Sequence, residues 1–198
     1  MPRREGPTAA RLGPGAGMSI KVVDAVQEDL MAEVWDLYYT TFHELNAFAV
    51  QRHLMFRSEF DEVMLDTRVQ KYLCLADDGS VCGLSTYTNM LDAMPLISPA
   101  YFERRWPELF AQNRIWYCGF VAVEKNGRTS TAFSELVEAM YLTAAEQRGI
   151  IGLDFCRFND DQRHMARVIE LKLHRLSGHV RAERMDEQAF WLYEFPAA

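Results

Sequence analysis

The spacing of hydrophobic positions predicts that the chain begins with one strand and two helices. Residues 19–26 alternate apolar and polar side chains, which is typical of a strand. From Glu28 to Leu45 the apolar residues recur every three or four positions, and a similar pattern covers Gln51 to Val69. That spacing places the apolar side chains on one face of each predicted helix.

The middle of the chain predicts a hairpin, an interrupted helix and a long strand. Two β-rich runs within KYLCLADDGSVCGLSTYT (71–88) flank Asp78-Gly79, a strong hairpin signal. Ser98-Pro99 has the pattern of an N-cap followed by proline at the first helical position, so a helix is expected from Pro99 to Phe110. Pro107 should kink or break it. The strand IWYCGFVAV follows, within 114–123.

The last third predicts helix, strand, helix and strand. A helix is expected from Ser130 to Gln147, and a short buried strand at 150–155. Asn159-Asp160-Asp161 should begin a helix that runs to Leu176, and AFWLYEF (189–195) has the composition of a closing strand. The fold class is therefore α/β, a single mixed β-sheet flanked by helices, with parallel strands around the central strand–helix–strand unit.

Composition indicates a soluble globular protein. The 198 residues are 49% hydrophobic and 25% charged, and no apolar run approaches the roughly 20 residues of a membrane span. The net charge of -7 argues against a broad surface for nucleic acid or anionic membrane. Residues 1–17 are rich in Gly, Pro, Ala and Arg, which predicts a disordered tail before a folded domain at 18–198.

The four cysteines predict a cytoplasmic protein with reduced thiols. Cys74, Cys82, Cys118 and Cys156 lie in strand-like apolar runs and form no CxxC pair. Buried, unpaired thiols are usual in cytosolic proteins. We therefore expect neither a disulfide framework nor a metal site.

The segment from Ile115 to Met140 passes from a strand through a polar stretch into a helix. The polar stretch, NGRTST (126–131), contains one glycine, one arginine and three hydroxyl residues. Unpaired N–H groups at a helix N-terminus bind phosphate, glycine permits close approach, and arginine adds charge. Hydroxyl residues also cap helices, so the spacing alone leaves a phosphate site and a plain capped turn as alternatives.

The segment order and this loop resemble the GNAT acyltransferase superfamily. The family pattern after the fourth strand is roughly V-x-P/V-x-x-R-G-x-G-x-G/A, and this chain has VAVEKNGRTSTAF, with threonines where two of the glycines are usual. The resemblance implies a GNAT-like sheet and acetyl-CoA or a longer acyl-CoA as co-substrate. The implied cofactor-binding residues are Val121, Val123, Gly127, Arg128, Thr129, Ser130, Thr131 and Asn159, the last at the start of the next helix.

A closer resemblance covers about Phe60 to Val123. SEFDEVMLD, KYLCLADDGSVCGL, RWPELFAQ and IWYCGFVAV follow in the order seen in the acyl-homoserine-lactone autoinducer synthases and the long-chain N-acyl amino acid synthases. Gly119 stands where that branch has an arginine, Trp116 where it has a glutamate, and Ser85 near its second arginine. The resemblance therefore implies an acyl-thioester scaffold with a different acceptor.

The implied function is transfer of an acyl group from a thioester to an amine of a small molecule. His174, four residues before Gly178, stands where the family has its acidic tyrosine, and a histidine donates a proton near neutral pH. Glu124 is the candidate base, directly or through water, and a backbone N–H between Val121 and Val123 is the candidate oxyanion donor. The alternative for His174 is a surface or half-buried helix histidine without a catalytic role, and the alternative for Glu124 is a solvated loop carboxylate.

Acceptor contacts are expected from Tyr38, His43, Trp116 and Asp154. Tyr38 also fits a core position, and Asp154 stands in an apolar strand, where an unpartnered carboxylate is costly. The acyl donor is coenzyme A or an acidic acyl carrier protein, which would need a basic patch from Arg128, Arg163, Arg167, Lys172 and Arg175. The chain is expected as a monomer or homodimer. A catalytically lapsed GNAT-like domain that binds a ligand or partner is the alternative.

Overall fold

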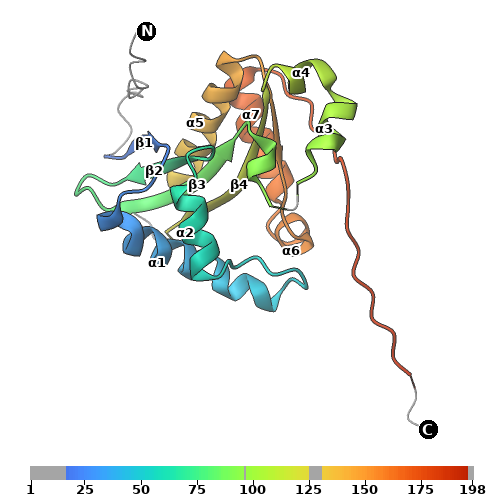
Figure 1. The fold of residues 1–198 in the computed structure, drawn as a ribbon, viewed down its shortest axis with the longest axis horizontal. Helices are drawn as coiled ribbons and strands as arrows, with labels where there is room; N and C mark the ends of the chain where they lie inside the picture. The colour runs from blue at the N-terminus through green and yellow to red at the C-terminus, as the bar shows by residue number, and fades with distance from the viewer. Residues whose placement is uncertain (1–16, 96, 125–130, 196–198) are drawn as a thin grey trace.

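Five strands form one mixed sheet in the computed structural model, which describes residues 17–95, 97–124 and 131–195. They are β1 (Ser19–Val23), β2 (Gln70–Leu75), β3 (Val81–Thr88), β4 (Ile115–Val123) and β5 (Ile150–Leu153) (Figure 1). Their order in the sheet is their order in the sequence. β1 to β4 are antiparallel neighbours, and β5 lies parallel to β4. The predicted mixed α/β sheet is confirmed.

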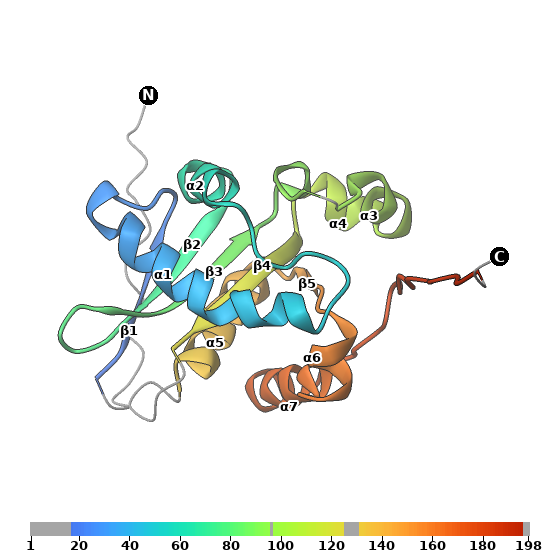
Figure 2. The ribbon, with the colours of Figure 1, turned by 90° about the horizontal axis from the view of Figure 1, so that it is seen from below.

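Helices cover both faces of this sheet (Figure 2). One face packs against α1 (Met31–Phe42) and α2 (Arg57–Leu65), and the other against α5 (Ala132–Glu146) and α7 (Met165–Ser177). The period-two alternation of a strand divides its side chains between two cores: in β2, Leu73 faces α1 and α2, whereas Tyr72 and Cys74 face α5.

A third cluster closes the end of the sheet where β4 begins. It involves α3 (Pro99–Arg105) and α4 (Pro107–Ala111), whose side chains pack with Leu91, Ile115 and Tyr117. The predicted break at Pro107 is confirmed, since Trp106 leaves the helical conformation between the two helices. The predicted hairpin is also confirmed: β2 and β3 pair across a turn in which Gly79 has φ +85.

Two predicted helix starts are wrong. The helix expected from Gln51 begins at Arg57, because Phe56 is extended and its N–H donates to the Glu59 carboxylate. Asn159-Asp160-Asp161 lies inside the short helix α6 (Arg157–Asp161) and does not begin the long one. α7 begins only at Met165, after His164 adopts a left-handed backbone that interrupts the helix.

The predicted closing strand is also wrong. Residues 189–195 have no strand assignment, and Trp191 and Phe195 are 79% and 88% exposed. The segment leaves the body of the molecule and runs outward (Figure 1). The β-rich composition of AFWLYEF supplies propensity, but a strand also needs a neighbouring edge, and this segment has none in the described chain.

All four cysteines are free, and three of them are fully buried: Cys74, Cys82 and Cys118. Burial raises the pKa of Cys74 and Cys118 to about 12, so these thiols stay protonated and unreactive. Within the described ranges, no group of three or more His, Cys, Asp or Glu side chains is placed to hold a metal. A helix long and apolar enough to cross a membrane is likewise not found there.

Candidate functional site

β4 and β5 separate partway along their length and leave an opening at the sheet edge. Their pairing runs from Ile115–Ile150 to Cys118–Leu153, where β5 ends. β4 continues to Val123, paired only with β3. The edge of β4 beyond Cys118 therefore presents backbone groups toward the space between the two strands.

A β-bulge at Gly119 marks the start of this opening. Thr86 pairs with Phe120 and Tyr87 with Cys118, which leaves Gly119 as the extra residue. A Cβ on Gly119 would lie 2.6 Å from Thr86 Oγ1 and 2.5 Å from Met94 Cε. The methionine tip can move, but the threonine is fixed on β3, so packing excludes an arginine from this position.

The open edge directs backbone N–H groups outward at alternate residues. The N–H of Glu124 donates to the carbonyl of Cys82 on β3, over 3.0 Å. Because neighbouring residues of an antiparallel strand point their N–H groups to opposite edges, those of Val121 and Val123 point toward the opening. The two residues expected to bind a cofactor through their backbone thus lie where that binding is possible.

An apolar cavity lies beside this edge, between the sheet, α5 and α7. Its lining side chains are Cys118, Val121, Phe133, Val137, Met140, Ile151, Leu153, Ile169 and Leu173. α7 is held against α5 by the ion pair between Lys172 Nζ and Glu138 Oε2, 2.7 Å apart. A cavity with this lining accepts a chain of methylene groups better than a charged group.

The carboxylate of Asp154 lies directly after β5 and bonds to a buried tyrosine. Tyr117 OH donates to Asp154 Oδ1 over 2.7 Å, and burial together with this neighbour raises the pKa of Tyr117. Asp154 itself is exposed. It therefore does not lie among apolar groups, as the sequence suggested, but is fixed at the surface with one oxygen bonded.

His53 lies within electrostatic range of Asp154. Its Nε2 atom is buried and has no hydrogen-bond partner among the described residues. Burial lowers the pKa of His53 below its usual 6.5, and the charge of Asp154 partly opposes that change. The lowered pKa favours the neutral form of the ring, whose Nε2 atom is a buried polar atom without a partner among the described residues. No motif contains His53, so sequence reasoning missed it.

Tyr38 holds the loop that carries His53. Its OH donates to the carbonyl of His53 over 3.1 Å and accepts from the N–H of Met55 over 2.9 Å. The ring is 1% exposed and packs among Phe42, Phe60 and Phe120. Tyr38 is thus a core residue that positions the loop, and any contact of its own with a substrate would need the loop to move.

The loop is also tied to the far side of the opening. Phe48 stacks on Phe158 of α6, with ring centroids 4.6 Å apart. Beside Phe158, the Oδ1 atom of Asn159 is buried and has no partner among the described residues. Asn159 was expected to bind the cofactor, and an unsatisfied buried oxygen is the feature that a ligand donor would correct.

Four other residues that the sequence predicted to belong to the site lie away from the group formed by Tyr117, His53 and Asp154, or at its edge. Trp116 is buried on the α5 face, stacked on Tyr87, so it belongs to the core on the opposite side from Tyr117. His43 is exposed and stacks on Tyr39. His174 is exposed on α7, and Glu124 is exposed just after β4.

Part of the predicted phosphate loop can be placed. Gly127, Arg128, Thr129 and Ser130 lie outside the described residues. Thr131 is the exposed N-cap of α5, and its side chain makes no capping hydrogen bond. The plain capped turn would use such a bond, so Thr131 does not support that alternative.

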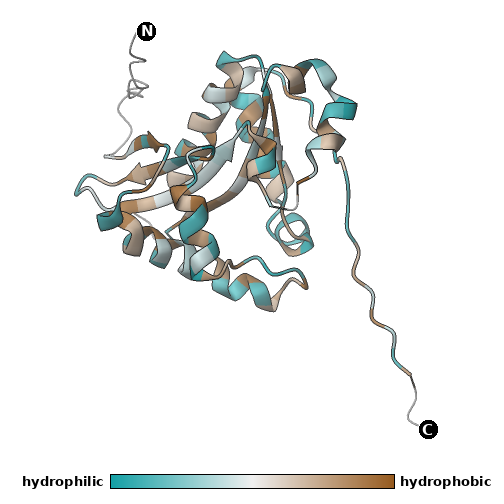
Figure 3. Cartoon of the chain, viewed as in Figure 1, coloured by the Kyte–Doolittle hydropathy of each residue, from teal (hydrophilic) through white to brown (hydrophobic). Residues whose placement is uncertain are grey.

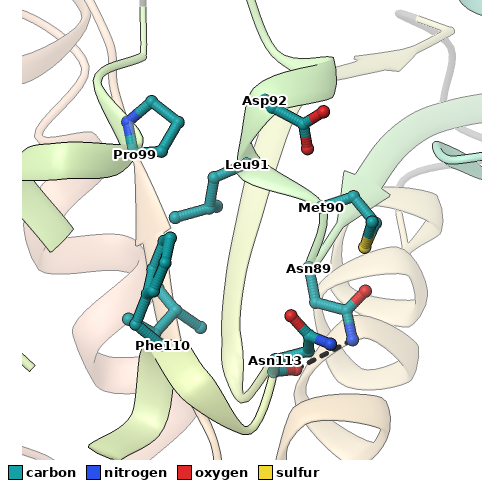
Figure 4. Close-up of a pocket in the computed structure, with 8 residues that line it drawn as sticks. Asn89, Met90, Leu91, Asp92, Pro99, Phe110 and Asn113 are labelled. Atoms are coloured by element: carbon teal, nitrogen blue, oxygen red, sulfur yellow. Dashed lines mark hydrogen bonds between the residues drawn. The ribbon is translucent and has the colours of Figure 1, made fainter. Parts of the chain in front are cut away.

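A second pocket lies at the other end of β4 (Figure 4). It is lined by Asn89, Met90, Leu91, Asp92, Pro99, Phe110, Asn113 and Ile115. Asn89 Nδ2 donates to the carbonyl of Asn113 over 2.8 Å, which closes one side. Because the pocket adjoins the first residue of β4, it is separate from the opening at Gly119–Val123.

Comparison with known proteins identifies this architecture. No family model matches the sequence, and no curated protein matches it. A ribosomal-protein-alanine N-acetyltransferase from Brucella melitensis biovar Abortus 2308 superposes with a TM-score of 0.51 at 13% identity, over 89% of this chain and 99% of that one. The chain has the GNAT acetyltransferase fold.

Two further structures with the GNAT fold match over similar lengths. An aminoglycoside 6'-N-acetyltransferase from Acinetobacter baumannii has a TM-score of 0.51 and 12% identity, over 89% of this chain and 99% of its own. A possible acetyltransferase from Clostridium difficile 630 has a TM-score of 0.52 and 11% identity, over 92% and 99%. At these identities the likeness concerns the fold.

Proposed function

We propose that this chain is an N-acyltransferase that moves an acyl group from a coenzyme A thioester to an amine of a small molecule. The observation that carries the proposal is the opening between β4 and β5, where the N–H groups of Val121 and Val123 border an apolar cavity. The solved structures with the same fold are named as acetyltransferases, which supports the reaction class.

The residues at the opening fit the parts of coenzyme A. Its pantetheine arm combines amides with methylene groups, which suits backbone donors at Val121 and Val123 beside an apolar wall. The buried oxygen of Asn159 offers an acceptor for an amide N–H of the same arm. The resemblance assigns the pyrophosphate to Gly127, Arg128, Thr129 and Ser130, with Thr131 at the start of α5.

The reaction requires a neutral amine, a base and an oxyanion donor. The amine nitrogen forms a bond to the thioester carbonyl carbon, and the C–S bond then breaks. We assign the oxyanion to the N–H of Val121 or Val123. His53 and Asp154 are the groups proposed to orient the amine and accept its proton, alongside Glu124, and His174 stays the proposed acid toward the leaving thiolate.

The proposed acceptor differs from the acceptor amino acid of the autoinducer-synthase branch. The three positions where that branch carries charge hold Gly119 at the bulge, Trp116 in the core, and Ser85, whose Oγ faces Met140 Sδ. None of these offers a charged contact to an acceptor carboxylate. The same losses favour the second candidate, a lapsed domain that binds a thioester without turnover.

The charges on α7 support coenzyme A over an acyl carrier protein as donor. Arg167 pairs with Glu170 at 3.0 Å, and Lys172 pairs with Glu138 at 2.7 Å. These partners neutralise part of the basic patch that an acidic carrier protein would need. The chain also has a net charge of -7, which repels such a carrier at long range.

A thermal-shift titration tests the proposal. Free coenzyme A, acetyl-CoA and a long-chain acyl-CoA should each raise the melting temperature, because a ligand that binds only the folded state stabilises it. Arg128→Glu should abolish these shifts, whereas the matched reversal Arg181→Glu, at an exposed residue outside the site, should not. Absence of a shift with free coenzyme A and with both of its thioesters would remove the proposal. Thiol release with a panel of amines then separates an enzyme from a lapsed binding domain.

A further inference from the structure

The second half of β3 carries buried hydroxyl groups. Its residues 85–88, STYT, are less hydrophobic than the start of the strand (Figure 3). Thr88 Oγ1 donates to a backbone carbonyl over 2.7 Å, but Thr86 Oγ1 and Tyr87 OH have no hydrogen-bond partner among the described residues. Thr86 is 1% exposed and Tyr87 is fully buried. A buried polar atom of this kind is costly, so each one calls for an explanation.

These two hydroxyl groups lie on opposite faces of the sheet, because neighbouring residues of a strand alternate. Tyr87 packs in the core against α5, where its ring stacks on Trp116. Thr86 pairs with Phe120, which packs against Tyr38 in the core beneath α1 and α2. Thr86 is therefore on the face of the sheet where Tyr38 holds the loop of the candidate site.

The Thr86 hydroxyl faces the space over the bulge at Gly119, and the tip of Met94 occupies that space. A Cβ on Gly119 would lie 2.6 Å from Thr86 Oγ1 and 2.5 Å from Met94 Cε, so both atoms border the same position. Met94 also packs in the cluster that contains Tyr117, whose OH donates to Asp154. The hydroxyl is thus on the side of the sheet that carries the proposed acceptor groups, under a methyl group that offers it no hydrogen bond.

Met94 is a side chain that can leave this position. It is half-buried and comes directly after η3 (Leu91–Ala93). Methionine is unbranched and has three rotatable bonds, so it adapts to new neighbours at little cost. When its methyl group turns aside, the Thr86 hydroxyl and the backbone at Gly119 are open to a ligand. A polar ligand atom at this point makes a hydrogen bond to the hydroxyl and removes the cost of its burial.

We propose that Thr86 and Gly119, under the movable cap of Met94, form an acceptor subsite that takes a neutral polar group of the amine substrate. That group is a hydroxyl or an amide, and the amine itself is held at Asp154. A charged group does not suit the subsite, because the side chains of Thr86 and Met94 carry no charge and an unpaired buried ion is costly. The inference rests on the proposed function and names its acceptor class, amino alcohols or amino amides.

Calorimetric titration of amines into the full chain, saturated with free coenzyme A, measures acceptor binding without turnover. Across a series of chain lengths, the best linear amino alcohol or amino amide should bind about two- to tenfold more tightly than the alkylamine of the same length, as one hydrogen bond allows. Thr86→Val keeps the shape and removes the hydroxyl, so it should abolish this preference. Thr86→Ser should retain it. Tyr87→Phe is the matched control, since it removes the unpartnered hydroxyl on the opposite face, and it should leave the preference unchanged.

Melting temperatures without amine give an independent check. Thr86→Val should keep or raise the melting temperature, because it removes a buried polar atom that has no partner among the described residues. A lower melting temperature would mean that the hydroxyl is already satisfied in the free chain, which overturns the subsite. Equal binding of both kinds of amine by the wild type, or a Thr86→Val chain that keeps the preference, overturns the subsite alone if coenzyme A still binds. Absence of coenzyme A binding overturns the proposed function, and the subsite with it.

Discussion

Tyr38→Phe should loosen the loop that carries His53 while leaving the core intact. The substitution removes one hydroxyl, which donates to the His53 carbonyl and accepts from the Met55 N–H. Each such hydrogen bond contributes about 0.5–1.5 kcal/mol, so the loss of both should lower the free energy of unfolding by about 1–3 kcal/mol. The ring itself keeps its contacts with Phe42, Phe60 and Phe120.

Two measurements check this expectation. Urea unfolding gives the change in free energy, and an NMR titration of the imidazole gives the pKa of His53. Burial holds that pKa below 6.5 in the native chain, so a looser loop should raise it toward 6.5. Tyr39→Phe is the control, since its side chain is 46% exposed, and it should change neither quantity. A Tyr38→Phe protein with wild-type stability and an unchanged His53 pKa would show that the Tyr38 hydroxyl does not hold the loop.

Three further substitutions probe the bulge, the carboxylate and a buried lysine. Gly119→Ala should lower the free energy of unfolding by about 1–3 kcal/mol, because its methyl group overpacks against Thr86 Oγ1. Adding Thr86→Ala should recover part of the lost free energy, as measured by urea unfolding of the double variant. Asp154→Asn should lower the His53 pKa further, by NMR titration, because it removes the charge that raises it; acyl transfer should slow while coenzyme A still binds. Burial lowers the pKa of Lys71 from 10.5 to about 8, so between these pH values the folded chain binds fewer protons than the unfolded chain. The free energy of unfolding should therefore rise as the pH rises from about 8 to 10.5. Lys71→Met should flatten that rise, measured by urea unfolding at several pH values.

The sheet and most helices follow from local patterns, which explains why they were predictable. Asp78-Gly79 fixes the β2–β3 hairpin through a positive φ that glycine adopts freely, and Pro107 breaks a helix because it cannot continue one. The strand IWYCGFVAV was found within one residue of its observed bounds. These signals are local, so neighbouring residues suffice to express them.

The site depends on features that a local pattern does not contain. The bulge at Gly119 is invisible because β4 is apolar throughout, so the change of alternation between Cys118 and Val121 leaves no mark in the sequence. His53 comes within electrostatic range of Asp154 because the Tyr38 hydroxyl holds the His53 carbonyl, which fixes the loop that carries His53 against the core. The segment 189–195 has strand propensity, but whether it forms a strand depends on an available edge.

Binding of coenzyme A at the β4 edge is measured by titrating the 15N-labelled chain with free coenzyme A and following the amide chemical shifts. Saturable shifts are expected at the backbone N–H groups of Val121 and Val123, with smaller changes at the residues of β4 whose N–H groups point toward β3. Shifts confined to the pocket around Asn89 and Asn113, or no saturable shift at all, would contradict binding at this edge.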